Sequence, residues 1–171
     1  MFKNISYLWM AIVLLLVQIF ILDQLSIAMW LRPMLFPLIV MLLPMEWRTI
    51  WVLIIALLVG VVMDMSLGGA GLYTATLLPL AVVRRSVMYM TTHRSVEHGD
   101  QTSLLSNISL RQLMIYVSAM MGLHHILFFV FETLSFASPL HLVATILCST
   151  VLSVVIAWPI VRLFISKIVE K

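Results

Sequence analysis

GVVMDMSLGGAGLY, residues 60–73, interrupts a long apolar part of the chain with a carboxylate that is followed by three glycines. Glycine adopts the positive φ angles that a tight turn needs, and it allows two backbones to approach closely. Asp64 precedes Gly68, Gly69 and Gly71, and apolar runs lie on both sides of this group. The stretch therefore predicts a sharp corner at which one apolar helix ends and the next begins.

The predicted corner lies near the far end of a helix that starts after Arg48. At a rise of 1.5 Å per residue, Asp64 lies about 24 Å along this helix. Its carboxylate can accept backbone N–H groups at the start of the next helix, where a negative charge also suits the helix dipole. Three interpretations stay open: a plain interfacial hairpin with a solvated Asp64, a specific structural or partner-binding corner, and a proton or ion relay. We prefer the second, because a single acid makes a poor relay although an acid in a membrane segment is a functional candidate by default.

The composition indicates the class of protein. Of the 171 residues, 63% are hydrophobic and 10% are charged, and the mean hydropathy is +1.16. A soluble domain contains about 25% charged residues, so this chain has too little polar surface to cover a globule in water. The basic residues are spread between apolar runs, which argues against a nucleic-acid interface despite the pI near 9.4. We therefore expect a single all-α integral membrane domain over residues 1–171.

Apolar runs bounded by charges predict the membrane-spanning helices, because a bilayer core about 30 Å thick needs roughly 20 apolar residues per helix. The predicted spans are residues 4–22, 33–45, 49–64, 70–84, 112–131 and 140–161, with a cytoplasmic loop at 85–111. The first run is longer than the apolar core of a signal peptide, which favours a retained helix. The second is short, and Pro37 and Pro44 would kink or end a helix there, so we expect a bent or partly re-entrant element. The chain is thus predicted to form a six-transmembrane-helix bundle.

Charges between the spans predict the orientation of the bundle. With the N-terminus inside, the inner connections carry nine of the ten basic residues, and the outer ones carry only Arg32. The nine are Lys3, Arg48, Arg84, Arg85, Arg94, Arg111, Arg162, Lys167 and Lys171. Cytoplasmic connections are enriched in Lys and Arg, so both termini are expected in the cytoplasm. Counting residues 33–45 as a span preserves this alternation.

Few polar side chains lie inside the predicted spans, and we expect them to make interhelical hydrogen bonds. The candidates are His124 and Ser149. His124 and His125 point about 100° apart on a helix, so at most one of them faces a given neighbour. Cys148 is the only cysteine, which excludes an intramolecular disulfide and a cysteine-based zinc site. No catalytic motif, phosphate-binding loop or metal-ligand pattern is evident, so we expect no enzyme activity, metal or cofactor.

The corner and the run before it resemble a known family. Its pattern is a glycine, an aspartate four residues later, Gly-rich residues and a Gly-Leu pair that opens the next helix. The corresponding residues here are Gly60, Asp64, Gly68, Gly71 and Leu72. The preceding RPMLFPLIVMLLPMEWR, residues 32–48, resembles the short Pro-marked second element of the same family. Over residues 32–85 the chain thus resembles the rod shape-determining protein MreD family of bacteria.

The resemblance implies a multi-pass protein of the bacterial cytoplasmic (inner) membrane that acts without catalysis. It implies a place in the elongation complex that determines cell shape and regulates peptidoglycan synthesis. It also implies association with the single-span membrane protein MreC, and through it with the actin-like MreB and the peptidoglycan synthases.

The implied fold is similar to the six-helix membrane substrate-binding component of energy-coupling-factor vitamin transporters, so a subunit of such a transporter is the alternative function. The bulky run at residues 7–20 argues against this alternative, because small residues at every fourth position would be needed to dock the coupling subunit. An enzyme of lipid or wall-precursor chemistry is a third hypothesis, and it lacks candidate residues.

Overall fold

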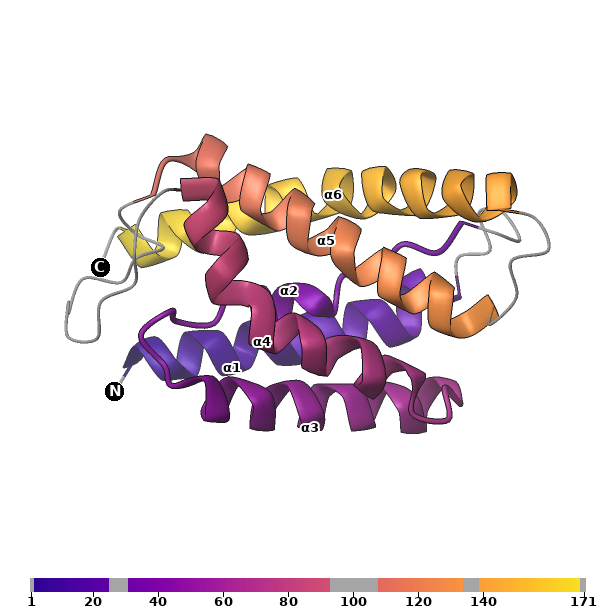
Figure 1. The fold of residues 1–171 in the computed structure, drawn as a ribbon. Helices are drawn as coiled ribbons and strands as arrows, with labels where there is room; N and C mark the ends of the chain where they lie inside the picture. The colour runs from indigo at the N-terminus through magenta and orange to yellow at the C-terminus, as the bar shows by residue number, and fades with distance from the viewer. Residues whose placement is uncertain (1, 25–30, 93–107, 134–138, 170–171) are drawn as a thin grey trace.

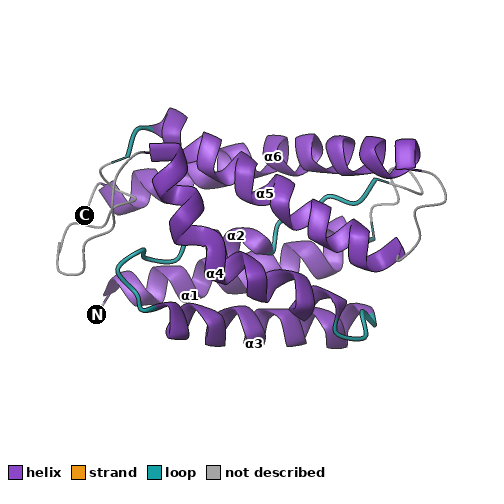
Figure 2. Cartoon of the chain, viewed as in Figure 1, coloured by secondary structure: helices purple, strands orange, loops and turns teal. Residues whose placement is uncertain are grey.

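The computed structural model describes residues 2–24, 31–92, 108–133 and 139–169, which are mainly helical (Figures 1 and 2). In chain order the helices are α1 (Phe2–Val17), continued by the short π-helix η1 (Gln18–Leu22), α2 (Pro37–Met41), α3 (Thr49–Leu67), α4 (Leu72–Thr92), α5 (Leu110–Thr133) and α6 (Pro139–Val169). The prediction of an all-α fold is confirmed for these residues.

The long helices run back and forth along one direction of the molecule. Figure 1 shows that α1 begins and α6 ends near the same end of the molecule, whereas the turn between α3 and α4 lies at the opposite end. From α3 onward each helix packs against the next, and α2 contacts α1, α3, α4 and α5. The short helix α2 therefore lies at the centre of the bundle.

Three helices in the described part of the chain are long and apolar enough to cross a bilayer, namely α3, α5 and residues Leu140–Leu163 of α6. A shorter apolar helix covers Tyr7–Leu22. Large apolar side chains such as Trp9, Leu58 and Leu147 face outward along these elements. Soluble monomers rarely expose such extensive apolar surface, so the structure indicates a membrane protein.

The second predicted span, residues 33–45, is not a continuous helix. Only Pro37–Met41 are helical. Five residues at 1.5 Å each make a helix about 8 Å long, which is too short to cross a core about 30 Å thick. Irregular chain lies on both sides, yet every residue from 33 to 45 is buried. We call residues 31–48 the core segment.

Helix α4 extends beyond the predicted boundary at residue 84 and continues to Thr92. Arg84 and Arg85, expected at the end of a span and at the start of the loop 85–111, lie inside this helix and contact the core segment. Their charges lower the hydropathy of α4, which is the physical reason that it is not among the helices apolar enough to cross a bilayer. Residues 93–107 of the predicted loop lie outside the described residues.

Candidate functional site

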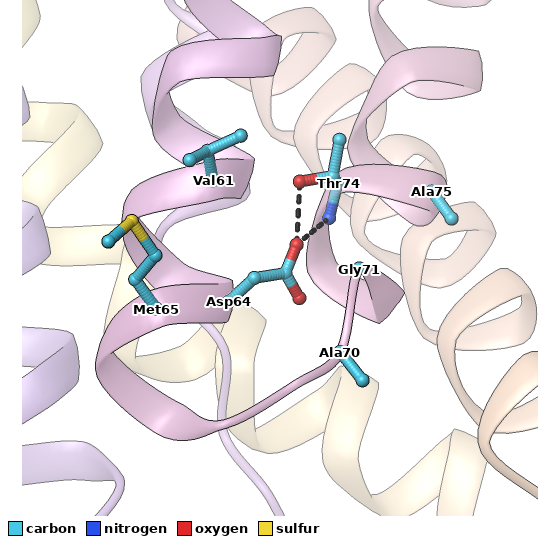
Figure 3. Close-up of a pocket in the computed structure, with 7 residues that line it drawn as sticks. All are labelled: Val61, Asp64, Met65, Ala70, Gly71, Thr74 and Ala75. Atoms are coloured by element: carbon cyan, nitrogen blue, oxygen red, sulfur yellow. Dashed lines mark hydrogen bonds between the residues drawn. The ribbon is translucent and has the colours of Figure 1, made fainter.

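The corner between α3 and α4 is built around the carboxylate of Asp64 (Figure 3). Asp64 Oδ1 accepts the backbone N–H of Tyr73 at 3.0 Å. Asp64 Oδ2 accepts the backbone N–H of Thr74 at 3.0 Å and its hydroxyl at 2.6 Å. The two N–H groups belong to the first turn of α4, where backbone donors lack partners within the helix. The predicted capping role of Asp64 is confirmed by these bonds, while a partner-binding role stays a prediction.

Glycines make the geometry of the corner possible. Gly68, at the end of α3, has a φ of +71°, and Gly71 has a φ of +93°; side chains are strained in this left-handed region. Gly60 is needed for close approach, because a Cβ there would lie 2.6 Å from Thr74 Cα. A Cβ on Gly69, which is not part of the family pattern, would also collide with neighbouring side chains.

An open hollow of about 560 Å³ lies on the outer surface beside the corner. Its lining residues are Val61, Asp64, Met65, Ala70, Gly71, Thr74 and Ala75 (Figure 3). The small side chains of α4 shape the hollow, while the Asp64 carboxylate is already bonded to α4. Leu72, the last residue of the family pattern, opens α4 and packs partly buried against the core. Three of the seven lining residues, Ala70, Gly71 and Ala75, are small and apolar, and small residues allow a second helix to approach closely within a bilayer.

The core segment brings irregular backbone into the middle of the bundle, where each N–H and C=O group needs a hydrogen-bond partner. Arg84 on α4 is buried and supplies several of them. Its Nη1 donates to the carbonyl of Val40 at 3.0 Å, and its Nη2 donates to the carbonyls of Leu43 at 2.6 Å and Pro44 at 2.9 Å. These carbonyls lie at and just after the end of α2, where a cation suits the helix dipole. From the sequence, Arg84 was used only to predict the orientation of the bundle in the membrane, and its hydrogen bonds to the core segment were not foreseen.

Two further side chains hold carbonyls of the core segment. Arg85 Nη2 donates to the carbonyls of Met45 at 3.1 Å and Trp47 at 2.7 Å. From α5, the hydroxyl of the buried Tyr116 donates to the carbonyl of Met41 at 3.2 Å. The C-terminal half of the core segment is thus tied to both α4 and α5.

Gln18, at the start of η1, clamps the N-terminal half of the core segment. Its Nε2 donates to the carbonyl of Pro33 at 3.2 Å, and its Oε1 accepts the N–H of Leu35 at 2.6 Å. One buried amide therefore satisfies a backbone acceptor and a backbone donor at once. An amide inside an apolar run was a usable signal for this role, and sequence reasoning did not single it out.

Helices α5 and α6 reach the same part of the core segment through a chain of hydrogen bonds. Ser153 Oγ accepts the N–H of Met34 at 2.9 Å and lies 3.3 Å from His125 Nε2. His125 Nδ1 lies 2.8 Å from the carbonyl of Met121, which can only accept, so Nδ1 carries the hydrogen. Nε2 lies within hydrogen-bond distance of the Ser153 hydroxyl, so His125 links α5 to α6 beside the core segment.

The two predicted polar contacts have different outcomes. Ser149 accepts the backbone N–H of Arg32 at 3.3 Å, so it contacts the core segment. His124 is buried, but neither of its ring nitrogens has a hydrogen-bond partner in the described part of the chain. Its ring packs edge-on against Phe36, with centroids 5.1 Å apart. The choice of His124 was wrong by one residue, because the sequence does not reveal which of two adjacent histidines faces α6.

The described residues contain no group of three or more His, Cys, Asp or Glu side chains placed to hold a metal ion. Polar side chains of η1, α4, α5 and α6 instead bond to the core segment. Comparisons of the chain with family models, with curated proteins and with solved structures found no match.

Proposed function

We propose that this protein is a non-catalytic membrane scaffold of the bacterial cell-elongation machinery. In this role it binds an MreC-like single-span protein in the inner membrane, in one assembly with MreB and the peptidoglycan synthases. It thereby takes part in cell shape determination and in the regulation of peptidoglycan synthesis. The resemblance over residues 32–85 is the source of these partners.

The observation that carries the proposal is the joint role of the family-pattern residues at the α3–α4 corner. Asp64 caps α4, Gly60 allows α3 and α4 to approach, and Gly68 and Gly71 adopt positive φ angles. The pattern thus corresponds to one built structural unit. The Asp64 carboxylate accepts hydrogen bonds from Tyr73 and Thr74 of the same chain. These bonds support a structural role for Asp64 and not a catalytic one.

The distribution of polar groups supports the scaffold role as well. Several polar side chains inside the bundle, among them Gln18, Arg84 and Ser153, hold the core segment, while the outer faces of α1, α3 and α6 are apolar. Helices in a bilayer associate mainly through van der Waals packing, and small residues at the interface allow close approach. The hollow beside the corner, where Gly71 and Ala75 lie one turn apart, is our proposed contact for the partner's helix.

We also propose that the chain crosses the inner membrane six times, with both termini in the cytoplasm. The core segment is then the second crossing, made mostly of irregular backbone inside the protein. Irregular backbone is tolerated at membrane depth where protein covers it, and the burial of residues 33–45 supports this assignment.

Affinity purification of the tagged protein from gently solubilised membranes, with partners identified by mass spectrometry, tests the proposal. We expect recovery of an MreC-like protein and of elongation proteins. Ala75→Leu fills the hollow and should reduce this recovery, whereas Ala144→Leu on the exposed face of α6 should not. Recovery of ATPase subunits with a coupling membrane protein would instead assign the chain to a vitamin transporter.

A further inference from the structure

An apolar groove of about 450 Å³ runs between α1 and α3, with part of the core segment as its floor. Ala11 and Leu15 line one wall, Leu58 and Val62 line the other, and Ile39 lies in the floor. All of its lining residues are aliphatic or aromatic. Such a surface inside a bilayer fits a hydrocarbon chain.

The depth of the groove corresponds to one leaflet. Trp47 lies at one end, and the walls extend from Tyr7 to Leu15 on α1 and from Ile55 to Val62 on α3. At 1.5 Å per residue these walls are about 12 Å and about 10 Å long. One leaflet is half of a core about 30 Å thick, or about 15 Å. A spanning helix of a partner would need contact over the whole core, whereas an acyl chain needs about the depth that the groove offers.

Positive charge surrounds the Trp47 end of the groove. Arg48 is exposed and directly precedes α3, whose first turn has neither an acidic residue nor a side-chain cap. Arg85 donates to the carbonyl of Trp47 from α4. Glu46, the acid beside Trp47, interacts electrostatically with the buried Arg84. Two cations at this end, Arg48 and Arg85, against one acid leave it positive, which favours a phosphate group.

From the groove and its charged end we propose that one acyl chain of an anionic phospholipid occupies the groove between α1 and α3, with the headgroup phosphate beside Arg48. The lipid comes from the leaflet at the Arg48 end of α3. Tyr7 and Trp47 flank this end, as amphipathic rings do at the headgroup level. The inference does not depend on the scaffold role, since it needs only the groove, the charge and a bilayer.

Quenching of Trp47 fluorescence by brominated lipids tests the site. The other tryptophans, Trp9, Trp30, Trp51 and Trp158, are replaced by Phe, and the protein is reconstituted with brominated phosphatidylglycerol or brominated phosphatidylcholine. A basic residue near the membrane surface contributes about 1 kcal/mol to the binding free energy of an anionic lipid. We therefore expect about a fivefold preference for phosphatidylglycerol over phosphatidylcholine. Arg48→Gln should remove most of this preference, while Arg162→Gln, a change of another exposed arginine, should leave it intact.

A second pair of variants tests the groove itself. Ala11→Leu narrows the groove and should reduce quenching by both lipids, whereas Ala144→Leu on the outer face of α6 should not. In the protein that keeps only Trp47, equal quenching by brominated phosphatidylglycerol and brominated phosphatidylcholine would overturn the proposed headgroup site. Unchanged quenching in Ala11→Leu would overturn the acyl-chain site.

Native mass spectrometry of the wild-type protein in detergent gives a measurement that does not depend on the tryptophan replacements. Retention of phosphatidylglycerol over phosphatidylcholine, reduced by Arg48→Gln, supports the proposal. Equal retention of phosphatidylglycerol and phosphatidylcholine by the wild-type protein contradicts the proposal.

Discussion

At the scale of single residues, the corner shows how one carboxylate organises two helices. An ordinary helix cap comes from the residue just before the helix. Here Asp64 belongs to the end of the preceding helix and bonds to Tyr73 and Thr74 across the turn. The cap therefore satisfies backbone donors of α4 and also holds α3 and α4 together, because the carboxylate lies on α3 and the N–H groups lie on α4.

Replacement of Asp64 by alanine tests this role. Loss of the carboxylate leaves the first-turn donors of α4 without their acceptor, so we expect Asp64→Ala to lower the free energy of unfolding by about 2 kcal/mol. Unfolding in detergent measures the effect, and Asp23→Ala, at an exposed acid, is the control. Normal membrane levels together with normal cell shape in Asp64→Ala would refute the role of the corner.

Two glycines differ sharply in the space around them, which gives a matched pair of variants. In Gly60→Ala the new Cβ lies 2.6 Å from Thr74 Cα, a backbone atom, whereas in Gly122→Ala the nearest side-chain atom is 3.8 Å away. Overpacking of this kind costs about 1–3 kcal/mol, so Gly60→Ala should unfold at lower temperature. Gly122→Ala should be neutral or stabilising, and equal effects of the two changes would argue against close contact of α3 with α4.

At the scale of elements, the core segment explains where the polar side chains of this apolar chain are used. A regular helix satisfies its own backbone, but α2 has only five residues. The core segment as a whole depends on neighbours, and it is bonded from four different helices by Gln18, Arg84, Tyr116 and Ser153. The polar groups that hold the element are therefore distant from it in sequence.

Arg84 should be the most sensitive of these groups. Arg84→Met removes the guanidinium donors of three buried carbonyls, of which Pro44 keeps only a long bond from the Trp47 N–H at 3.4 Å. We expect this change to cost about 3–5 kcal/mol. Arg84→Lys keeps the charge but lacks the guanidinium fork, so an intermediate loss is expected. Thermal unfolding in detergent distinguishes the variants, with Arg111→Met at an exposed position as the control. A small effect of Arg84→Met would mean that the core segment does not need this side chain.

The adjacent histidines of α5 provide a second test of the core segment. His125→Phe removes the bonds to Ser153 and Met121 and should destabilise the protein by about 2 kcal/mol. His124→Phe replaces a ring whose nitrogens have no hydrogen-bond partner in the described structure, so it should be neutral or stabilising and should leave function intact. Complete loss of function in His124→Phe would point to a polar or metal-binding role for this ring.

At the scale of the whole molecule, the helices surround a central segment that they hold from several sides. Figure 1 shows α1 beginning and α6 ending at one end of the bundle, opposite the α3–α4 corner. We propose that these two ends face opposite sides of the membrane, as the distribution of basic residues predicts.

Cysteine labelling in intact cells tests the orientation. In a Cys148→Ala background, Ser66→Cys lies near the α3–α4 corner, and Ser109→Cys lies next to the start of α5 at the other end; both positions are exposed. A membrane-impermeant maleimide should label position 66 in intact cells and position 109 only after lysis. The reverse result would place both termini outside the cytoplasm.

The amino-acid sequence by itself determined the class of the protein, the approximate starts of the long helices, and the corner at residues 60–73. Apolar runs and glycines act locally, so their consequences can be predicted without knowledge of neighbours. Tertiary structure decided that residues 33–45 form a buried irregular element, that α4 continues past Arg84, and that His125 in place of His124 faces α6. Each of these outcomes depends on hydrogen bonds between residues far apart in the chain, which local patterns do not specify.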